Sequence, residues 1–342
     1  MPTMCIFNIQ VQDSNICQLR LDFLEFEMDG GSSIDKPCDR DAVEIFSGSS
    51  NGLGNGRLCG QNTNQHLYIP IDSSQSRPMI RVITDGRFND DDTFTSTGYK
   101  FRIRVMQLDC SSREERIREL VAPNGCLQYF TKRRGSVTSF NWDPLNRRQY
   151  VPDQRYSICF RRQPSDCRLE LKRSRLAPAF STSVGKVPLL ANQNIYSNNV
   201  CGPENGCGVK ECTSFSATAQ AGMPATFNDY LQISAAYRKQ EAANNPNQEI
   251  YVLSSYYCGA GVGRDAERQA TQDQFDGDDE GTGIISDGPF ILTFNADANP
   301  GVLPDAGNQN QQQQSEALNE LGFSLDYRLS TSCPDLTFGD SN

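Results

Sequence analysis

An alternating stretch near the start of the chain constrains the fold more than any other feature. Leu19, Leu21 and Phe23 are apolar, whereas Arg20 and Asp22 between them are polar. A repeat of two is the pattern of a β-strand with one buried face and one face in water. The sequence therefore predicts that strands, not helices, build this part of the chain.

A second strand of the same kind follows, and cysteines bracket it. Val43 and Ile45 flank an outward Glu44, with Cys38 before the strand and Cys59 after a glycine-rich loop. The first hundred residues are therefore expected to hold several short strands with cysteines near their ends.

The order of cysteines, strands and acids in this region occurs again in the rest of the chain. In both copies a cysteine opens an alternating strand, a Cys-Gly pair follows, and an acid ends a later strand before the last cysteine. The corresponding positions are Cys5 and Cys159, Cys17 and Cys167, Cys59 and Cys258, Asp85 and Asp297, and Cys110 and Cys333. A repeat of this length indicates two tandem domains, not a solenoid.

The composition is that of a globular protein long enough for two domains. Of 342 residues, 37% are hydrophobic and 22% are charged. No apolar run approaches the ~20 residues of a membrane span, and the start, Met-Pro-Thr-Met, lacks the basic and apolar regions of a signal peptide. A net charge of −10 disfavours nucleic acid as a partner and favours cations or the basic surfaces of other proteins.

Thirteen cysteines are spread along the chain rather than grouped in close pairs, and there is a single histidine. Zinc sites cluster their cysteine and histidine ligands, so disulfides in an oxidising compartment are the better interpretation. Without a signal peptide, this compartment implies a processed or truncated N-terminus. The sequence therefore predicts a secreted, extracellular protein.

Together these features resemble the CUB domain, a jelly-roll β-sandwich of extracellular proteins. The resemblance rests on an ordered set of motifs: Asp29 after an apolar strand, Cys38 with Asp41 three residues later, Cys59-Gly60, Thr84-Asp85, and Gly98-Tyr99-Lys100-Phe101. It implies an all-β fold with two jelly-roll β-sandwich domains in tandem. Residues 126–142 and 60–69 are similar to segments of arthropod secreted CUB-containing proteins in particular.

The resemblance also implies domain limits. The first domain covers 1–110, and it is expected to lack its N-terminal strand or strands because the family partner of Cys5 would lie upstream. A linker, 111–125, follows. The second domain covers 126–335, with long insertions at about 175–225, 260–288 and 299–318, and a tail at 336–342.

Overlaying the two copies on the family pattern predicts the disulfides. The predicted pairs are Cys38 with Cys59, Cys126 with Cys159, Cys17 with Cys110, and Cys167 with Cys333. Cys258 takes one of Cys201, Cys207 and Cys212, the other two bond each other, and Cys5 is left over. Spacing alone does not determine connectivity, so this scheme is a hypothesis.

Many CUB domains bind Ca²⁺ with three acids from neighbouring loops, and the resemblance carries these acids onto Asp29, Asp41 and Asp85. The family more often has glutamate at the first of these places. Ca²⁺ takes oxygen ligands, and three clustered carboxylates would repel one another without a cation. In related domains the same acids also receive a lysine or arginine from a partner protein. The alternative is a set of solvated loop acids.

In the second domain, Asp229 and Asp297 correspond to the second and third of these acids. An insertion removes the counterpart of the first, and Thr226 stands where a cysteine is expected. Solvated acids are therefore the favoured interpretation there, with a metal site as the alternative. The acidic run at 276–281 lacks the glutamate spacing of an EF-hand loop and is interpreted as solvated.

The sequence offers little support for catalysis. A single histidine, His66, excludes an HExxH metal site, and no serine nucleophile loop follows, so His66 is interpreted as a structural hydrogen-bonding residue. The glycines at 259–266 only faintly resemble a dinucleotide fingerprint. Lys132–Arg134 and Arg161–Arg162 are interpreted as solvated strand ends, with a polyanion site as the alternative.

We therefore expect a secreted, non-enzymatic protein that recognises other extracellular proteins, with Ca²⁺ as its candidate cofactor. Two alternatives stay open. The chain could be a structural component of an extracellular matrix or filament, which would self-associate, or the non-catalytic region of a CUB-containing protease.

Overall fold

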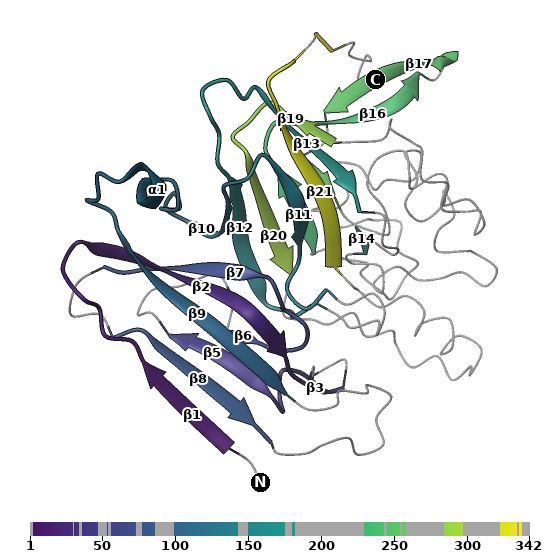
Figure 1. Cartoon of the computed structure of the whole chain (residues 1–342). Helices are drawn as coiled ribbons and strands as arrows, with labels where there is room; N and C mark the ends of the chain where they lie inside the picture. The colour runs from purple at the N-terminus through teal and green to yellow at the C-terminus, as the bar shows by residue number, and fades with distance from the viewer. Residues whose placement is uncertain are drawn as a thin grey trace, which may run out of the picture. The chain divides into compact units, whose positions relative to one another are not determined.

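The structure is a computed structural model in which β-strands make up nearly all regular elements (Figure 1). It describes residues 3–29, 31–33, 36–46, 53, 56–72, 77–85, 99–142, 150–174, 180–181, 229–242, 245–253, 255–257, 284–296, 322–333 and 335–336. Within these ranges the only helix is α1 (Glu115–Arg118), and no helix there is long and apolar enough to cross a membrane. The predicted all-β fold is confirmed.

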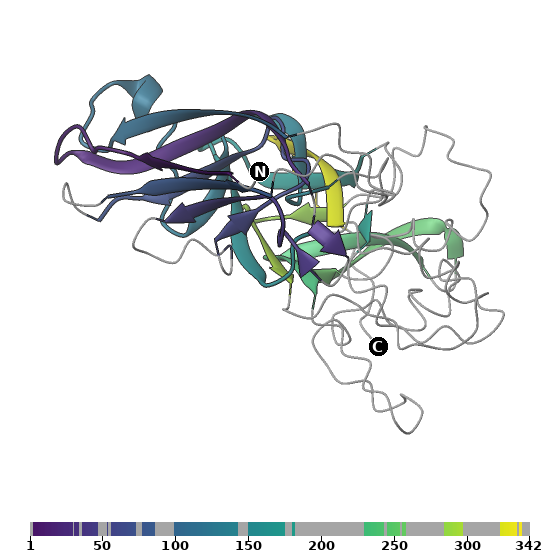
Figure 2. The same ribbon diagram turned by 90° about the horizontal axis from the view of Figure 1, so that it is seen from below.

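The chain divides into two compact units, of which unit 1 contains residues 1–131, 140–160 and 296–300. Two antiparallel sheets in unit 1 lie face to face as layers (Figure 2). The first sheet has the order β1 (Thr3–Asn8), β8 (Met79–Thr84), β5 (Ala42–Phe46) and β6 (Arg57–Leu58). The second has the order β7 (His66–Pro70), β2 (Ile16–Glu27) and β9 (Lys100–Asp109).

The alternation of β2 explains how this sandwich is packed. Leu19, Leu21 and Phe23 have no solvent contact, and burying each such side chain contributes about 1.5–3 kcal/mol. Glu44 on β5, expected on a wet face, is instead nearly buried. The reason is that Arg57 and Arg81 both form ion pairs with its carboxylate.

Two further strand pairs complete unit 1. Strands β10 (Cys126–Phe130) and β12 (Gln154–Phe160) run parallel, and the short β3 (Gly31–Ser33) pairs with β4 (Lys36–Pro37). The segment before β10 is held on β2: the side chain of Gln18 donates to the carbonyl of Ala122 (2.7 Å) and accepts its N–H (2.9 Å).

Unit 2 contains residues 132–139, 161–295 and 301–342. Its main sheet has the order β11 (Arg134–Thr138), β21 (Gly322–Ser330), β13 (Arg168–Arg173), β19 (Ile284–Ser286), β16 (Ala236–Ala242) and β17 (Asn245–Leu253), with β14 (Phe180–Ser181) paired to β21. A second group has the order β20 (Ile291–Ala296), β15 (Tyr230–Ile233) and β18 (Tyr256–Tyr257). Leu169 and Leu325 are fully buried, and the rings of Phe294 and Phe323 lie 5.4 Å apart.

Four disulfides join the described part of the chain, and they are the same four pairs that the overlay of the two copies predicts. They are Cys17–Cys110, Cys38–Cys59, Cys126–Cys159 and Cys167–Cys333. Cys5 has a free, exposed thiol. The predictions for Cys258, Cys201, Cys207 and Cys212 fall outside the described residues.

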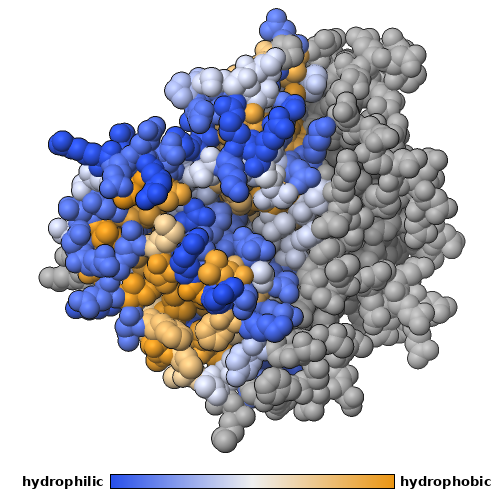
Figure 3. All heavy atoms as spheres, viewed as in Figure 1, coloured by the Kyte–Doolittle hydropathy of each residue, from blue (hydrophilic) through white to orange (hydrophobic). Residues whose placement is uncertain are grey.

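Apolar side chains are exposed along the edge strand β1. Met4, Ile6 and Phe7 are each about half exposed, and every residue of β1 is exposed. On β9, Val105 is also exposed although it pairs with the buried Leu21. The space-filling view shows apolar residues gathered where Figure 1 draws β8 and β9 (Figure 3).

Candidate functional site

Three strand ends bring the three predicted acids of the first domain together. Asp29 follows β2, Asp41 precedes β5 and Asp85 follows β8. Because β5 and β8 are antiparallel neighbours, the start of β5 and the end of β8 lie at the same end of the sheet. The N–H of Asp85 donates to Oδ1 of Asp41 at 3.0 Å, and the backbone of Asp29 also hydrogen-bonds to the Asp41 carboxylate. Asp41 is therefore the centre of the cluster.

The first of these acids is positioned by a buried contact with the Cys-Gly pair. Met28 is fully buried, and its N–H donates to the carbonyl of Gly60 at 3.0 Å. Gly60 follows Cys59, which is bonded to Cys38, and Cys38 lies three residues before Asp41. The disulfide thus ties the segment that carries Asp41 to the segment that orients the end of β2.

The electrostatics of Asp41 are those of a confined carboxylate. Asp41 is only 4% exposed, and this burial raises the pKa of its carboxyl group. The negative charges of Asp85 and Asp29 act in the same direction, whereas the two backbone hydrogen bonds oppose the rise in pKa. Nη1 of Arg40 lies 3.7 Å from Oδ2 of Asp29. A cation among these carboxylates would favour the ionised form of Asp41.

The donor set fits Ca²⁺ in chemistry, since it consists of carboxylate oxygens on loops at strand ends. The spacing is looser than in a formed metal centre. Among the described residues, no group of three or more His, Cys, Asp or Glu side chains has the arrangement of a metal site. Asp29, Asp41 and Asp85 therefore lie near one another, and a bound ion would require their side chains to turn toward a common point.

The second copy repeats part of this arrangement. Asp229 is nearly buried and precedes β15, which pairs antiparallel with β20 so that Tyr230 lies opposite Asn295. Asp41 has the same relation to β5 and β8, where Ala42 lies opposite Ile83. Asp297 and Thr226 are outside the described residues, as is the acidic run at 276–281.

His66 makes the structural hydrogen bond that the sequence predicts. Its Nε2 accepts the N–H of Tyr129 at 3.1 Å, and its ring contacts the ring of Phe130 with centroids 4.9 Å apart. Burial lowers the pKa of His66 to about 4, and the positive charge of Arg20 acts in the same direction. The side chain is therefore neutral at pH 7 and joins β7 to β10 within unit 1.

Asp22, Arg20, Arg104 and Tyr68 form a polar network that the sequence analysis does not predict. The alternation of polar and apolar residues predicts that Asp22 faces solvent, yet Asp22 is nearly buried because Arg20 and Arg104 both hydrogen-bond to its carboxylate. Burial alone would raise the pKa of Asp22, but these two hydrogen bonds hold it below its usual value. Arg20 also donates to the hydroxyl of Tyr68 at 3.0 Å. The signal in the sequence was an ion pair two residues apart on one strand face, Arg20 and Asp22.

Comparison with known families matches both parts of the chain. Residues 2–102 match the CUB domain, and residues 123–330 match the animal CUB domain. No curated protein matches the sequence. CUB domains and disulfides are typical of extracellular proteins, and CUB domains are generally non-catalytic modules of protein interaction. Since the second match alone spans more than half of the sequence, the chain belongs to the CUB family.

Proposed function

We propose that this chain is a secreted, non-enzymatic protein that recognises other extracellular proteins through a Ca²⁺ site made by Asp29, Asp41 and Asp85. The observation that carries the proposal is the burial of Asp41 between the backbones of Asp29 and Asp85. A carboxylate in such a place costs free energy unless a positive charge compensates it.

A partner would contribute a lysine or arginine to the same acids. Arg40, 3.7 Å from Asp29, supports this part of the proposal because it is a guanidinium already in contact with the cluster. A partner side chain that displaces Arg40 would gain a charge-assisted hydrogen bond with Asp29. Ca²⁺ would order the carboxylates for that contact and so make recognition depend on the ion.

Calorimetric titration with Ca²⁺ tests the site. The unmodified protein should release or absorb heat and melt at a higher temperature with Ca²⁺, and Asp41→Asn should abolish both effects. Glu25→Gln is the matched control, since Glu25 is an exposed acid that pairs with Arg102 on β9. A protein without binding heat and without a change in melting temperature would contradict the proposal.

The same titration addresses Asp229 and Asp297. If these two acids hold a second ion, the unmodified protein binds two equivalents of Ca²⁺ and Asp229→Asn binds one. A stoichiometry of one in both proteins would assign Ca²⁺ to the first domain only.

Self-association, as in a matrix or filament component, is a second candidate, supported by the exposed apolar strand β1. A strand edge with apolar side chains is a template for pairing with another chain. Light scattering should then show a concentration-dependent rise in mass that Met4→Ser reduces. Leu24→Ser is the control, because Leu24 is also an exposed apolar residue but lies on β2, between β7 and β9, and not at a sheet edge. A strict monomer at high concentration would exclude this candidate.

A further inference from the structure

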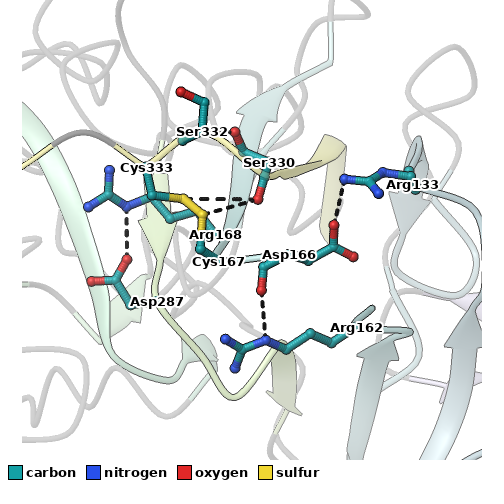
Figure 4. Close-up of a disulfide and its surroundings, with 9 residues drawn as sticks. All are labelled: Arg133, Arg162, Asp166, Cys167, Arg168, Asp287, Ser330, Ser332 and Cys333. Carbon is teal, nitrogen blue, oxygen red and sulfur yellow. Dashed lines mark hydrogen bonds and ion pairs between the residues drawn. A yellow bond between two sulfur atoms is a disulfide. The ribbon is translucent and has the colours of Figure 1, made fainter. Parts of the chain in front are cut away.

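Two basic segments that are far apart in the sequence meet in unit 2. Nη2 of Arg133 lies 2.5 Å from the carboxylate of Asp166, and Nε of Arg162 donates to the carbonyl of the same residue at 2.8 Å (Figure 4). Arg133 also donates to Gln163 at 3.3 Å. Asp166 is almost completely buried, so it fixes the segment 132–134 against the turn that connects β12 to β13.

The face of the sheet beside this turn adds further positive charge. Leu169 and Leu171 on β13 point into the core, so Glu170 between them points outward. Strand register places Arg134 on β11, Arg328 on β21 and Glu170 on β13 in one row across the sheet. Directly opposite like charges destabilise a strand pair, so the Arg134–Arg328 pair needs compensation.

Compensation in this row is incomplete. Glu170 forms an ion pair with Arg328, with 2.5 Å between Oε2 and Nη2. Arg134 and Lys132 are exposed, and neither forms an ion pair with an acid within the described ranges. Arg162 is also exposed. Its guanidinium donates to the carbonyl of Asp166 and lies over the ring of Phe290. Lys132, Arg134 and Arg162 are thus not paired with an acidic side chain in the described part of the chain, although the net charge of the sequence is −10.

We propose that Lys132, Arg134 and Arg162, with Arg328, form a binding surface for a sulfated linear polysaccharide, and we call it the basic face. The cations lie on an exposed strand face and an adjoining turn, which suits an extended polyanion. Guanidinium groups bind the oxygens of sulfate through paired hydrogen bonds, and they lose less hydration than an ammonium group does. The basic face lies on strands other than those that carry Asp29, Asp41 and Asp85, so it would act independently of the Ca²⁺ site.

Binding to immobilised heparin, as a probe for sulfated polysaccharides, tests this proposal. We expect the unmodified protein to bind at low salt, with an affinity that falls as salt rises because counterions are released. The double variant Lys132→Ser/Arg134→Ser should weaken binding about tenfold and flatten the salt dependence. Arg162→Ser, which changes the other segment, should weaken it in the same direction.

Arg102→Ser is the matched control, since Arg102 is a well-exposed arginine on β9 of unit 1. It should leave heparin affinity within about twofold. The control and the double variant should keep the unfolding temperature of the parent, because their changed side chains are exposed. Arg162→Ser also removes a hydrogen bond to the carbonyl of Asp166, so its affinity is measured at a temperature at which it is folded. Equal heparin affinity of the parent and the double variant would overturn the proposal. Equal binding of desulfated heparin or of polyglutamate would overturn the assignment of sulfate as the recognised group.

Discussion

Gly60 shows how one residue supports the acid cluster. Its φ is +73°, in the left-handed region that favours glycine, and a Cβ added there would lie 1.7 Å from Oδ1 of Asn141. Oδ1 of Asn141 accepts a hydrogen bond from the N–H of Gln61, and the backbone N–H of Asn141 donates to Oδ1 of Asn62, so Asn141 cannot simply move away. The carbonyl of Gly60 in turn holds Met28 beside Asp29.

Gly60→Ala is therefore expected to cost more than about 2 kcal/mol of unfolding free energy, because a steric clash adds to the strain of a left-handed alanine. Gly125→Ala is the control, since Gly125 also has a positive φ but has open space where its Cβ would lie. Gly125→Ala should cost about 1 kcal/mol, and urea titration of the two variants measures the difference. Equal costs for the two variants would show that Asn141 yields easily.

His66 makes stability depend on pH. Its pKa in the folded protein is about 4, below the unfolded value of 6.5, so the unfolded chain binds more protons between these values. The contribution of His66 is complete above pH 6.5 and is lost as the pH falls toward 4, by about 3 kcal/mol in all. Unfolding free energies measured between pH 7 and 4 should fall steeply in the parent and less steeply in His66→Gln. Parallel curves would contradict this assignment.

At the scale of elements, β2 and β9 are joined by a ladder of ion pairs on one face. The register places Asp22 opposite Arg104, Glu25 opposite Arg102, and Glu27 opposite Lys100. Both members of the Arg102–Glu25 pair are largely exposed, as is Lys100 of the Lys100–Glu27 pair, whereas Asp22 is nearly buried. Only the Asp22–Arg104 end of the ladder should therefore contribute much to stability.

Arg104→Gln is expected to cost about 1 kcal/mol, since it removes a partner from a buried carboxylate that Arg20 still holds. Arg102→Gln should cost less than about 0.5 kcal/mol because both members of its pair are in water. Thermal unfolding of the two variants compares them directly. A cost for Arg102→Gln that equals or exceeds that of Arg104→Gln would place the strength of the ladder at its exposed end.

At the scale of the whole molecule, the disulfides close loops of very different length. Cys38–Cys59 spans 21 residues and Cys167–Cys333 spans 166. A longer closed loop removes more freedom from the unfolded chain, so replacing the second pair by serine should cost about 5 kcal/mol and replacing the first about 3 kcal/mol. Urea titration of the two double variants measures the difference. The reverse order would indicate that local contacts outweigh chain entropy.

Much of the fold was predictable from local pattern. Leu19, Leu21 and Phe23 alternate with polar residues, and they are the buried positions of β2. The cysteine order of the two copies predicts the four disulfides that join the described residues. The domain limits at 110 and 126 stay predictions, and so does the metal role of Asp29, Asp41 and Asp85.

By itself, then, the sequence determined the strands, the repeat and the family, because residue alternation and cysteine order are properties of neighbours along the chain. Only the tertiary structure decided the burial of Asp41 and the partner of His66. It alone also brought the two basic segments together around Asp166. The contacts of Asp41 with Asp85, of His66 with Tyr129 and of Arg133 with Asp166 each join residues about 30 or more positions apart. Strand register and packing, not local propensity, determine which distant groups share a low-dielectric site.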